Sequence, residues 1–275
     1  MRVPILTYHS NNVAGNAYAG NDLVAFAQDL RLIDDLGLRI VPVQRVVDRL
    51  RGLCEEDLQG CVALTCDDGV DLDFFDLDYP VHGPQRSLLH SMRAFRDERG
   101  AQAQPGLHLT SFVIADPAAR AKMETDCLDG RRWMNDSWWR EAESTGLISI
   151  ENHSWDHNHP CLPSPGPHGI VRGDFHALAD DVQMRFEIGT AQDYIERTCG
   201  RRPRLFCYPF GHVGAFAHDW LAGNGPALGL DAAFGDGAAP IARASDRWNL
   251  PRYVCGWHWH SPDELRAILT RNGSG

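Results

Sequence analysis

The sequence alternates short apolar runs with amphipathic stretches, and this alternation restricts the chain to a small group of folds. Apolar residues recur at helical spacing between the runs, for example at Leu23, Phe26, Leu30 and Ile33. Strands that alternate with helices form a parallel sheet covered by those helices, so we expect an α/β fold. The runs that predict buried strands are residues 3–8, 38–43, 61–66, 109–115, 147–150 and 205–208.

Local signals predict where several helices begin and end. Asn21 or Asp22 can cap a helix, and Gly37 stands where this helix should stop. The last helix should begin at the segment 261–264, which has a Ser cap, Pro at the first position and two acids in the first turn. Other helical patterns cover residues 87–99, 136–145 and 175–198.

The length, the net charge and the hydrophobic segments of the chain limit its possible domain number, partners and location. A chain of 275 residues can bury one full core, so we expect a single domain over residues 1–275. The net charge of −11, without a basic cluster, disfavours nucleic acid and anionic lipid as partners. No segment reaches the roughly 18 apolar residues of a membrane span. The short N-terminal apolar run lacks a signal-peptide core and predicts a cytoplasmic protein.

The strand predicted at residues 61–66 ends abruptly in Asp67-Asp68-Gly69. α/β barrels carry their chemistry at the carboxyl ends of their strands. Two adjacent acids there can divide two tasks, because one can bind a metal while its neighbour acts as a general base. The alternative is an acidic turn whose carboxylates cap backbone amides.

The segment His153-Ser154-Trp155-Asp156-His157 carries two imidazoles four residues apart. On a helical turn this spacing places both rings on one face, where they can share a metal ion. The chain has 13 histidines, so the pair alone is weak support. A carboxylate third ligand, Asp68, would complete a site suited to Zn²⁺, with Co²⁺, Ni²⁺ or Fe²⁺ as alternatives.

Three segments together resemble the motifs of carbohydrate esterase family 4, the NodB-like polysaccharide deacetylases. TCDDG at 65–69 is similar to the family's T-F-D-D-G, HSWDH at 153–157 to its H-S/T-x-x-H, and RPRLFCYPFG at 202–211 to its R-P-x-x-F-R-x-P-x-G. The motifs follow the family's order, and the resemblance extends over roughly residues 5–270. It implies a distorted (β/α) barrel with fewer than eight regular strands.

The resemblance also implies roles for single residues. Asp67 would be the catalytic base, and Asp68, His153 and His157 would hold the metal. The backbone amide of Phe210 would stabilise the oxyanion.

Further residues are expected to shape the substrate site. Tyr208 and Pro209 would form the turn that presents the oxyanion-stabilising amide. Trp155 lies inside the metal motif and offers a flat face on which a sugar ring can stack. Trp133 offers a similar face, while Trp138 and Trp139 are equally compatible with a helix core.

The general acid is predicted to be His9, at the end of the apolar run Ile5-Leu6-Thr7-Tyr8. This arrangement is similar to circularly permuted members of the family, in which the corresponding motif opens the chain. His258 and His260 are the alternatives, and Asp246 is expected to orient the acid. Cys207 departs from the family, whose third motif often carries at this position an Arg that pairs with the catalytic Asp.

The resemblance therefore implies a hydrolase that removes N-acetyl groups from an amino sugar or an acetylated glycoconjugate. One alternative is hydrolysis of other non-peptide C–N bonds, in cyclic amides or ureides. Another is a non-catalytic carbohydrate-binding relative. The eight cysteines contain no CxxC pair and predict reduced, mostly buried thiols.

Overall fold

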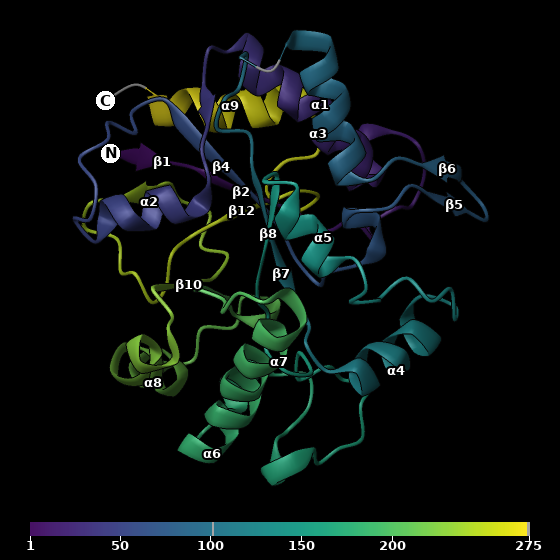
Figure 1. Ribbon diagram of the computed structural model, residues 1–275, viewed down its shortest axis with the longest axis vertical. Helices are drawn as coiled ribbons and strands as arrows, with labels where there is room; N and C mark the ends of the chain where they lie inside the picture. The colour runs from purple at the N-terminus through teal and green to yellow at the C-terminus, as the bar shows by residue number, and fades with distance from the viewer. Residues whose placement is uncertain (101, 274–275) are drawn as a thin grey trace.

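The computed structural model describes residues 1–100 and 102–273, and a parallel sheet lies at its centre (Figure 1). Seven strands follow one another in the order β10-β9-β8-β7-β4-β2-β12, and every pair along this path is parallel. The short strand β3 (Arg39–Ile40) pairs in parallel with the beginning of β4. This half-barrel confirms the predicted α/β class with fewer than eight regular strands along the path. The strands are β2 (Ile5–Tyr8), β4 (Cys61–Cys66), β7 (Leu109–Val113), β8 (Ile148–Asn152), β9 (Leu205–Cys207), β10 (Ala232–Phe234) and β12 (Tyr253–Val254).

Helices surround the sheet and cluster at its two ends. α1 packs against α3 and α9 at the top of Figure 1, whereas α5 and α7 pack against β8. Asn21 caps α1 as predicted, because its side chain accepts hydrogen bonds from the amides of Leu23 and Val24. The helices are α1 (Asp22–Asp35), α2 (Val43–Leu50), α3 (Leu88–Arg99), α4 (Pro117–Cys127), α5 (Trp139–Ser144), α6 (Asp181–Met184), α7 (Thr190–Cys199), α8 (Ala215–Asn224) and α9 (Pro262–Gly273).

Two of the sequence predictions are wrong in detail. The strand predicted at 38–43 is only two residues long, because Pro42 lacks an amide proton for the sheet and leads directly into α2. The helix predicted at 175–198 is broken into a 3₁₀ turn, the short α6, a π-helical turn over Arg185–Gly189 and α7. α2, α4 and α8 were not predicted.

Smaller elements lie at the edges of the molecule. β1 (Arg2–Val3) pairs antiparallel with β11 (Ile241–Ala242), and β5 (Leu77–Tyr79) forms a hairpin with β6 (Gly83–Gln85). Within residues 1–100 and 102–273, no helix combines the length and the apolar character needed to cross a bilayer. All eight cysteines are free.

The core explains why the central strands read as continuous apolar runs. Every residue of β2, β4 and β7 is buried, since helices or loops cover both faces of these strands. Trp138 and Trp139 are fully buried, and Trp138 donates its indole N–H to Asp71. These two tryptophans therefore belong to the core and offer no face to a sugar.

The register of the sheet brings the predicted site residues to one edge. β2 pairs Tyr8 with Cys66 of β4, and β7 pairs Val113 with Asn152 of β8. The residues that follow these strand ends therefore leave the sheet at the same edge. They include His9, Asp67 and His153.

Candidate active site

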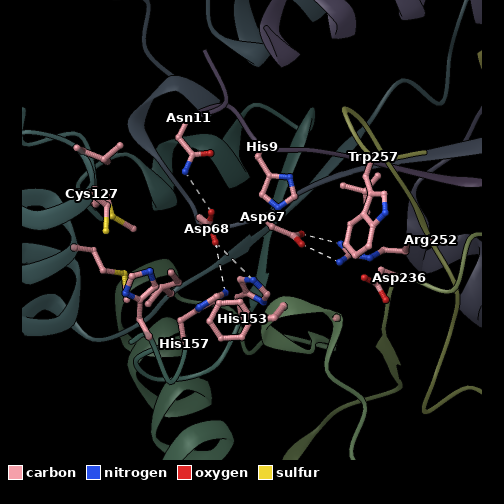
Figure 2. A pocket seen from close by; sticks show the side chains of 18 of the residues that line it. His9, Asn11, Asp67, Asp68, Cys127, His153, His157, Asp236, Arg252 and Trp257 are labelled. Carbon is pink, nitrogen blue, oxygen red and sulfur yellow. Dashed lines mark hydrogen bonds and ion pairs between the residues drawn. The ribbon is translucent and has the colours of Figure 1, made fainter. Parts of the chain in front are cut away.

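A pocket of about 440 Å³ opens at the carboxyl edge of the sheet. It is lined on one side by the acids and histidines predicted from the sequence, and on another side by apolar residues from and near α4 (Figure 2). The predicted site residues in its wall are His9, Asp67, Asp68, His153, His157 and Phe210.

Asp68, His153 and His157 lie close enough to hold one metal ion. The Oδ1 atom of Asp68 is 3.7 Å from Nε2 of His153 and 3.8 Å from Nε2 of His157. Ligand atoms about 2.1 Å from a tetrahedral ion are about 3.5 Å apart, so these distances fit such an ion with little movement. Both imidazoles are buried, and their ring centres are 4.8 Å apart.

The hydrogen bonds of the histidines also fit a metal site. Nδ1 of His153 donates to the backbone carbonyl of Cys207 at 2.9 Å, which leaves the lone pair of Nε2 directed at Asp68. Nδ1 of His157 is buried and has no hydrogen-bond partner among the described residues. Burial and the neighbouring His153 lower the pKa of His157 well below its usual value. His157 is therefore suited to bind as a neutral imidazole, and the hydrogen bond of His153 leaves its Nε2 facing Asp68.

The backbone around these ligands is bent, so the helical turn predicted for the two histidines is wrong. The segment after β8 is a loop in which Ser154 and His157 have φ angles of 69° and 61°. Asp68 likewise has φ 76° and is followed by Gly69, where a Cβ would lie 2.6 Å from Val113. Such unfavourable conformations concentrate at functional sites, where the surrounding fold enforces them.

Asp67 is buried and forms a two-pronged ion pair with Arg252. The guanidinium nitrogens Nη1 and Nη2 each lie 2.8 Å from a different carboxylate oxygen. Burial alone would raise the pKa of Asp67, but the charge and the two hydrogen bonds of Arg252 outweigh it and hold the pKa well below the usual range. Asp67 is therefore an anion at neutral pH.

Arg252 is the functional residue that the sequence reasoning missed. It lies just before β12 and reaches the position where the family's third motif often supplies an Arg, which this chain replaces with Cys207. The Sγ atom of Cys207 is 2.9 Å from Nη2 of Arg252, so the small side chain leaves room for the guanidinium. The available signal was only chemical: a buried acid without a cation in its usual position needs one from another segment, but this does not identify which residue supplies it.

His9 is the one predicted general acid that lines the pocket, and its imidazole lies beside Asp67 (Figure 2). Its backbone amide donates to Asp22 at 2.8 Å, which fixes the end of β2. His258 instead accepts a hydrogen bond from the amide of Val254, and His260 is half exposed next to Glu264. The geometry favours His9 over both alternatives.

Phe210 lies in a tight turn at the pocket wall. Its φ angle is 59°, and its ring contacts His157 edge-on at 4.4 Å between centroids. Two backbone hydrogen bonds close the turn, from the amides of Gly211 and His212, and neither uses the amide of Phe210. Gly211 is required because a Cβ there would lie 2.3 Å from the carboxyl carbon of Asp236.

The structure places three other predicted residues outside the pocket wall. Tyr208 is fully buried and donates its hydroxyl to the carbonyl of Trp248, while Pro209 is buried at the start of the turn. Both support the turn from behind and cannot contact a substrate directly. Trp155 packs against Phe186 and Tyr194 and faces a different surface hollow, so it cannot stack on a sugar in this pocket.

Asp246 is also not brought to the pocket. Its carboxylate accepts a hydrogen bond from Nε2 of His218 at 2.6 Å, and about half of its side chain is exposed. The acid-orienting role predicted for Asp246 is not supported, because its carboxylate pairs with a different histidine.

Comparisons with known proteins concern the fold and the sequence around this pocket. A family model described as polysaccharide deacetylase matches residues 102–222, which include both metal-site histidines and Phe210. No curated protein sequence matches the chain. The α/β half-barrel with an Asp-His-His cluster at its carboxyl edge is thus accompanied by a sequence match to the polysaccharide deacetylase family over residues 102–222.

Solved structures share the fold at low sequence identity. A deacetylase from Streptococcus pyogenes, PplD in complex with acetate, has a TM-score of 0.65 and 17% identity, with 98% of both chains covered. IcaB from Ammonifex degensii has a TM-score of 0.64 and 19% identity, covering 99% of this chain and 97% of that one. A de-N-acetylase from Aggregatibacter actinomycetemcomitans has a TM-score of 0.65 and 16% identity, covering 98% and 100%. The expectation of a circularly permuted member stays a prediction.

Proposed function

We propose that this protein is a metal-dependent hydrolase that removes the acetyl group from an N-acetylated amino sugar or glycoconjugate. One observation supports this proposal most directly. A buried, ionised carboxylate, Asp67, lies next to a three-ligand cluster in an open pocket. A proton acceptor beside a metal cluster is the arrangement that amide hydrolysis requires.

Asp68, His153 and His157 would hold the metal, most readily Zn²⁺, with Co²⁺, Ni²⁺ or Fe²⁺ as alternatives. When bound, the ion supplies Lewis-acid chemistry that acidifies water and polarises the acetyl carbonyl. The side chain of Asn11 lies 3.5 Å from Asp68 and restrains the carboxylate oxygen that faces away from the histidines.

The remaining steps belong to the protein's own residues. Asp67 accepts the proton of the attacking water, and Arg252 keeps Asp67 anionic and fixed in position. The amide of Phe210 donates a hydrogen bond to the acetyl oxygen as negative charge develops on it. His9 then donates a proton to the departing nitrogen, which releases acetate and a free amine.

The decisive experiment compares the wild-type protein with His153→Ala. We expect the variant to lose one equivalent of bound metal and to release no acetate from N-acetylglucosamine or its oligomers. His218→Ala is the matched control, because His218 lies outside the pocket and pairs with Asp246. Unchanged metal content and unchanged acetate release in His153→Ala would refute the proposed site.

The same assay separates this function from its alternatives. Ring opening of cyclic amides or ureides without acetate release would assign the site to another C–N hydrolase. Binding of acetylated sugars with no turnover in the metal-loaded wild type would indicate a carbohydrate-binding relative.

A further inference from the structure

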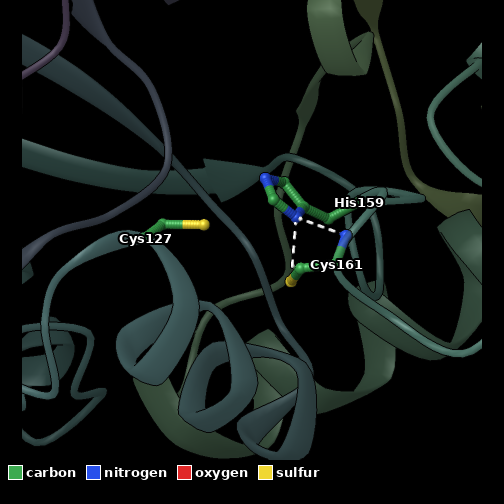
Figure 3. Close-up of side chains that lie close together, drawn as sticks. All are labelled: Cys127, His159 and Cys161. Carbon is green, nitrogen blue, oxygen red and sulfur yellow. Dashed lines mark hydrogen bonds between the residues drawn. The ribbon is translucent and has the colours of Figure 1, made fainter.

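A second group of metal-ligating side chains lies beside the pocket and takes no part in the proposed chemistry. Cys127 ends α4, while His159 and Cys161 follow the second metal-site histidine in the chain (Figure 3). The sulfur atoms of the two cysteines and a ring nitrogen of His159 all lie within 4.8 Å of one another. We infer that Cys127, His159 and Cys161 form a second metal site, specific for a thiophilic ion of the zinc class.

The ligand types set this site apart from the first one. Thiolate sulfur and imidazole nitrogen select zinc-class and other soft ions over Mg²⁺ or Ca²⁺, whereas the first cluster contains a carboxylate and no sulfur. Zinc commonly takes three such protein ligands with a fourth position left for water or another group. The two sites should therefore differ in spectroscopic properties as well as in affinity.

The loop holds His159 next to Cys161. The backbone amide of Cys161 donates to Nδ1 of His159 at 3.2 Å, so this nitrogen carries a lone pair and not a proton. The same nitrogen lies 3.0 Å from the sulfur of Cys161. The sulfur of Cys161 therefore lies beside an unprotonated ring nitrogen, and an ion bound here would replace these contacts with bonds to the ligand atoms.

An ion can reach this cluster without unfolding of the protein. Cys127 is exposed, and His159 and Cys161 are half-buried. Cys127 and His159 also line the main pocket, together with Met123 and Leu128 from α4 and its end. A bound ion would link the end of α4 to the loop that follows His157, and so stabilise this wall of the pocket.

Cobalt substitution provides a direct test. In fully reduced protein loaded with Co²⁺, thiolate ligands give an intense sulfur-to-metal charge-transfer band in the near ultraviolet, which a site of carboxylate and imidazole cannot give. We expect the wild type to show this band and to bind two equivalents of Co²⁺. Cys127→Ser and Cys161→Ser should each lose the band and one equivalent of metal.

Two control variants separate this inference from the proposed function. Cys54→Ser removes a cysteine whose sulfur lies near Arg45, away from the cluster, and should keep the band and both equivalents. His153→Ala should lose one equivalent and keep the band. If that variant behaves as wild type while the cysteine variants lose the band, the first site fails and the second stands.

Two results would overturn the inference. One is the absence of the charge-transfer band in reduced, cobalt-treated wild type whose circular dichroism shows a folded chain. The other is a Cys127–Cys161 disulfide, seen by mass spectrometry in protein purified without reductant, that survives equimolar Zn²⁺ and a mild phosphine reductant. Because Cys127 is exposed, its Ser variant should fold and keep the test valid.

Discussion

Asp67 and Asp29 are both buried carboxyl groups, but their surroundings give them opposite protonation behaviour. Asp67 faces Arg252, and its pKa is held well below the usual range. Asp29, on α1, faces the hydroxyls of Tyr8 and Tyr18 and the indole of Trp259. Burial raises its pKa to about 7, although these three donors act in the opposite direction.

The difference shows what neutral and charged partners can do for a buried acid. Three neutral donors stabilise the carboxylate of Asp29 but do not offset the cost of removing it from water. One guanidinium with two hydrogen bonds does offset that cost for Asp67. A buried carboxyl group that must be ionised at neutral pH thus needs a cation, whereas one that can keep its proton does not.

The largest effect should come from Asp67→Asn, which keeps the shape of the side chain but removes the proton acceptor. Acetate release should fall about 10²- to 10⁴-fold, with metal content unchanged. Asp29→Asn is the matched control and should keep its turnover, because Asp29 does not line the pocket. Equal losses in the two variants would mean that the pocket acid has no special role.

Arg252→Met should remove the feature that distinguishes the two acids. The variant leaves Asp67 buried without its cation, so the free energy of unfolding in urea should fall by about 3–5 kcal/mol. Turnover should fall as well, because removing the cation raises the pKa of Asp67 and so lowers its ionised fraction. Arg185→Met, which breaks a half-exposed pair with Asp181, should lower the free energy of unfolding far less, because solvent screens such pairs. Similar costs at the two sites would contradict the comparison.

Asp29→Asn should change the pH dependence of stability. The folded-state pKa of Asp29, about 7, lies above the usual value of about 3.9, so the folded protein binds this proton more tightly than the unfolded chain does. The resulting stability is present below about pH 4 and is lost as the pH rises through about 7.

Unfolding in urea between pH 4 and 8 measures this effect. The wild type should lose on the order of 1–3 kcal/mol more than Asp29→Asn over this range. The amide oxygen of the variant can face Tyr8 and Trp259 while its NH₂ donates to Tyr18, so the hydrogen bonds survive. Burial also raises the pKa of Asp73 to about 7, so the free energy of unfolding of the Asp29→Asn variant will still depend on pH. If the free energy of unfolding depended on pH identically in the two proteins, the raised pKa of Asp29 would be refuted.

The smallest effect is expected for Cys207→Ala. The thiol lies 2.9 Å from Arg252, but the two hydrogen bonds between Arg252 and Asp67 do not depend on it. Stability should fall by about 1 kcal/mol and turnover by less than tenfold. A loss as large as that of Arg252→Met would show that the thiol, and not the guanidinium, controls Asp67.

The sequence predicted those parts of the fold and site that depend on local chemistry. The run 61–66 is a strand with the predicted bounds, Asn21 caps its helix, and Asp68 meets the two histidines because the sheet register brings strand ends together. Arg252 could not be predicted, because its pairing with Asp67 depends on a strand of only two residues late in the chain.

The loop after β8 shows the second limit of the sequence. The four-residue spacing of His153 and His157 predicted a helical turn, but hydrogen bonds specific to this segment hold it in a loop. The hydroxyl of Ser154 accepts from the amide of His157, and Arg172 binds the carboxylate of Asp156. Such tertiary contacts override a spacing rule that applies only within a helix.

The ion pair of Asp67 and Arg252 has a consequence for biosynthesis. The two residues are separated by 185 positions, so the ribosome makes the acid long before its cation. Until Arg252 emerges, the nascent chain can bury Asp67 only as a protonated acid or an unpaired charge. This edge of the barrel should therefore become ordered only after Arg252 has left the ribosome, while the strands around β4 can begin to assemble earlier.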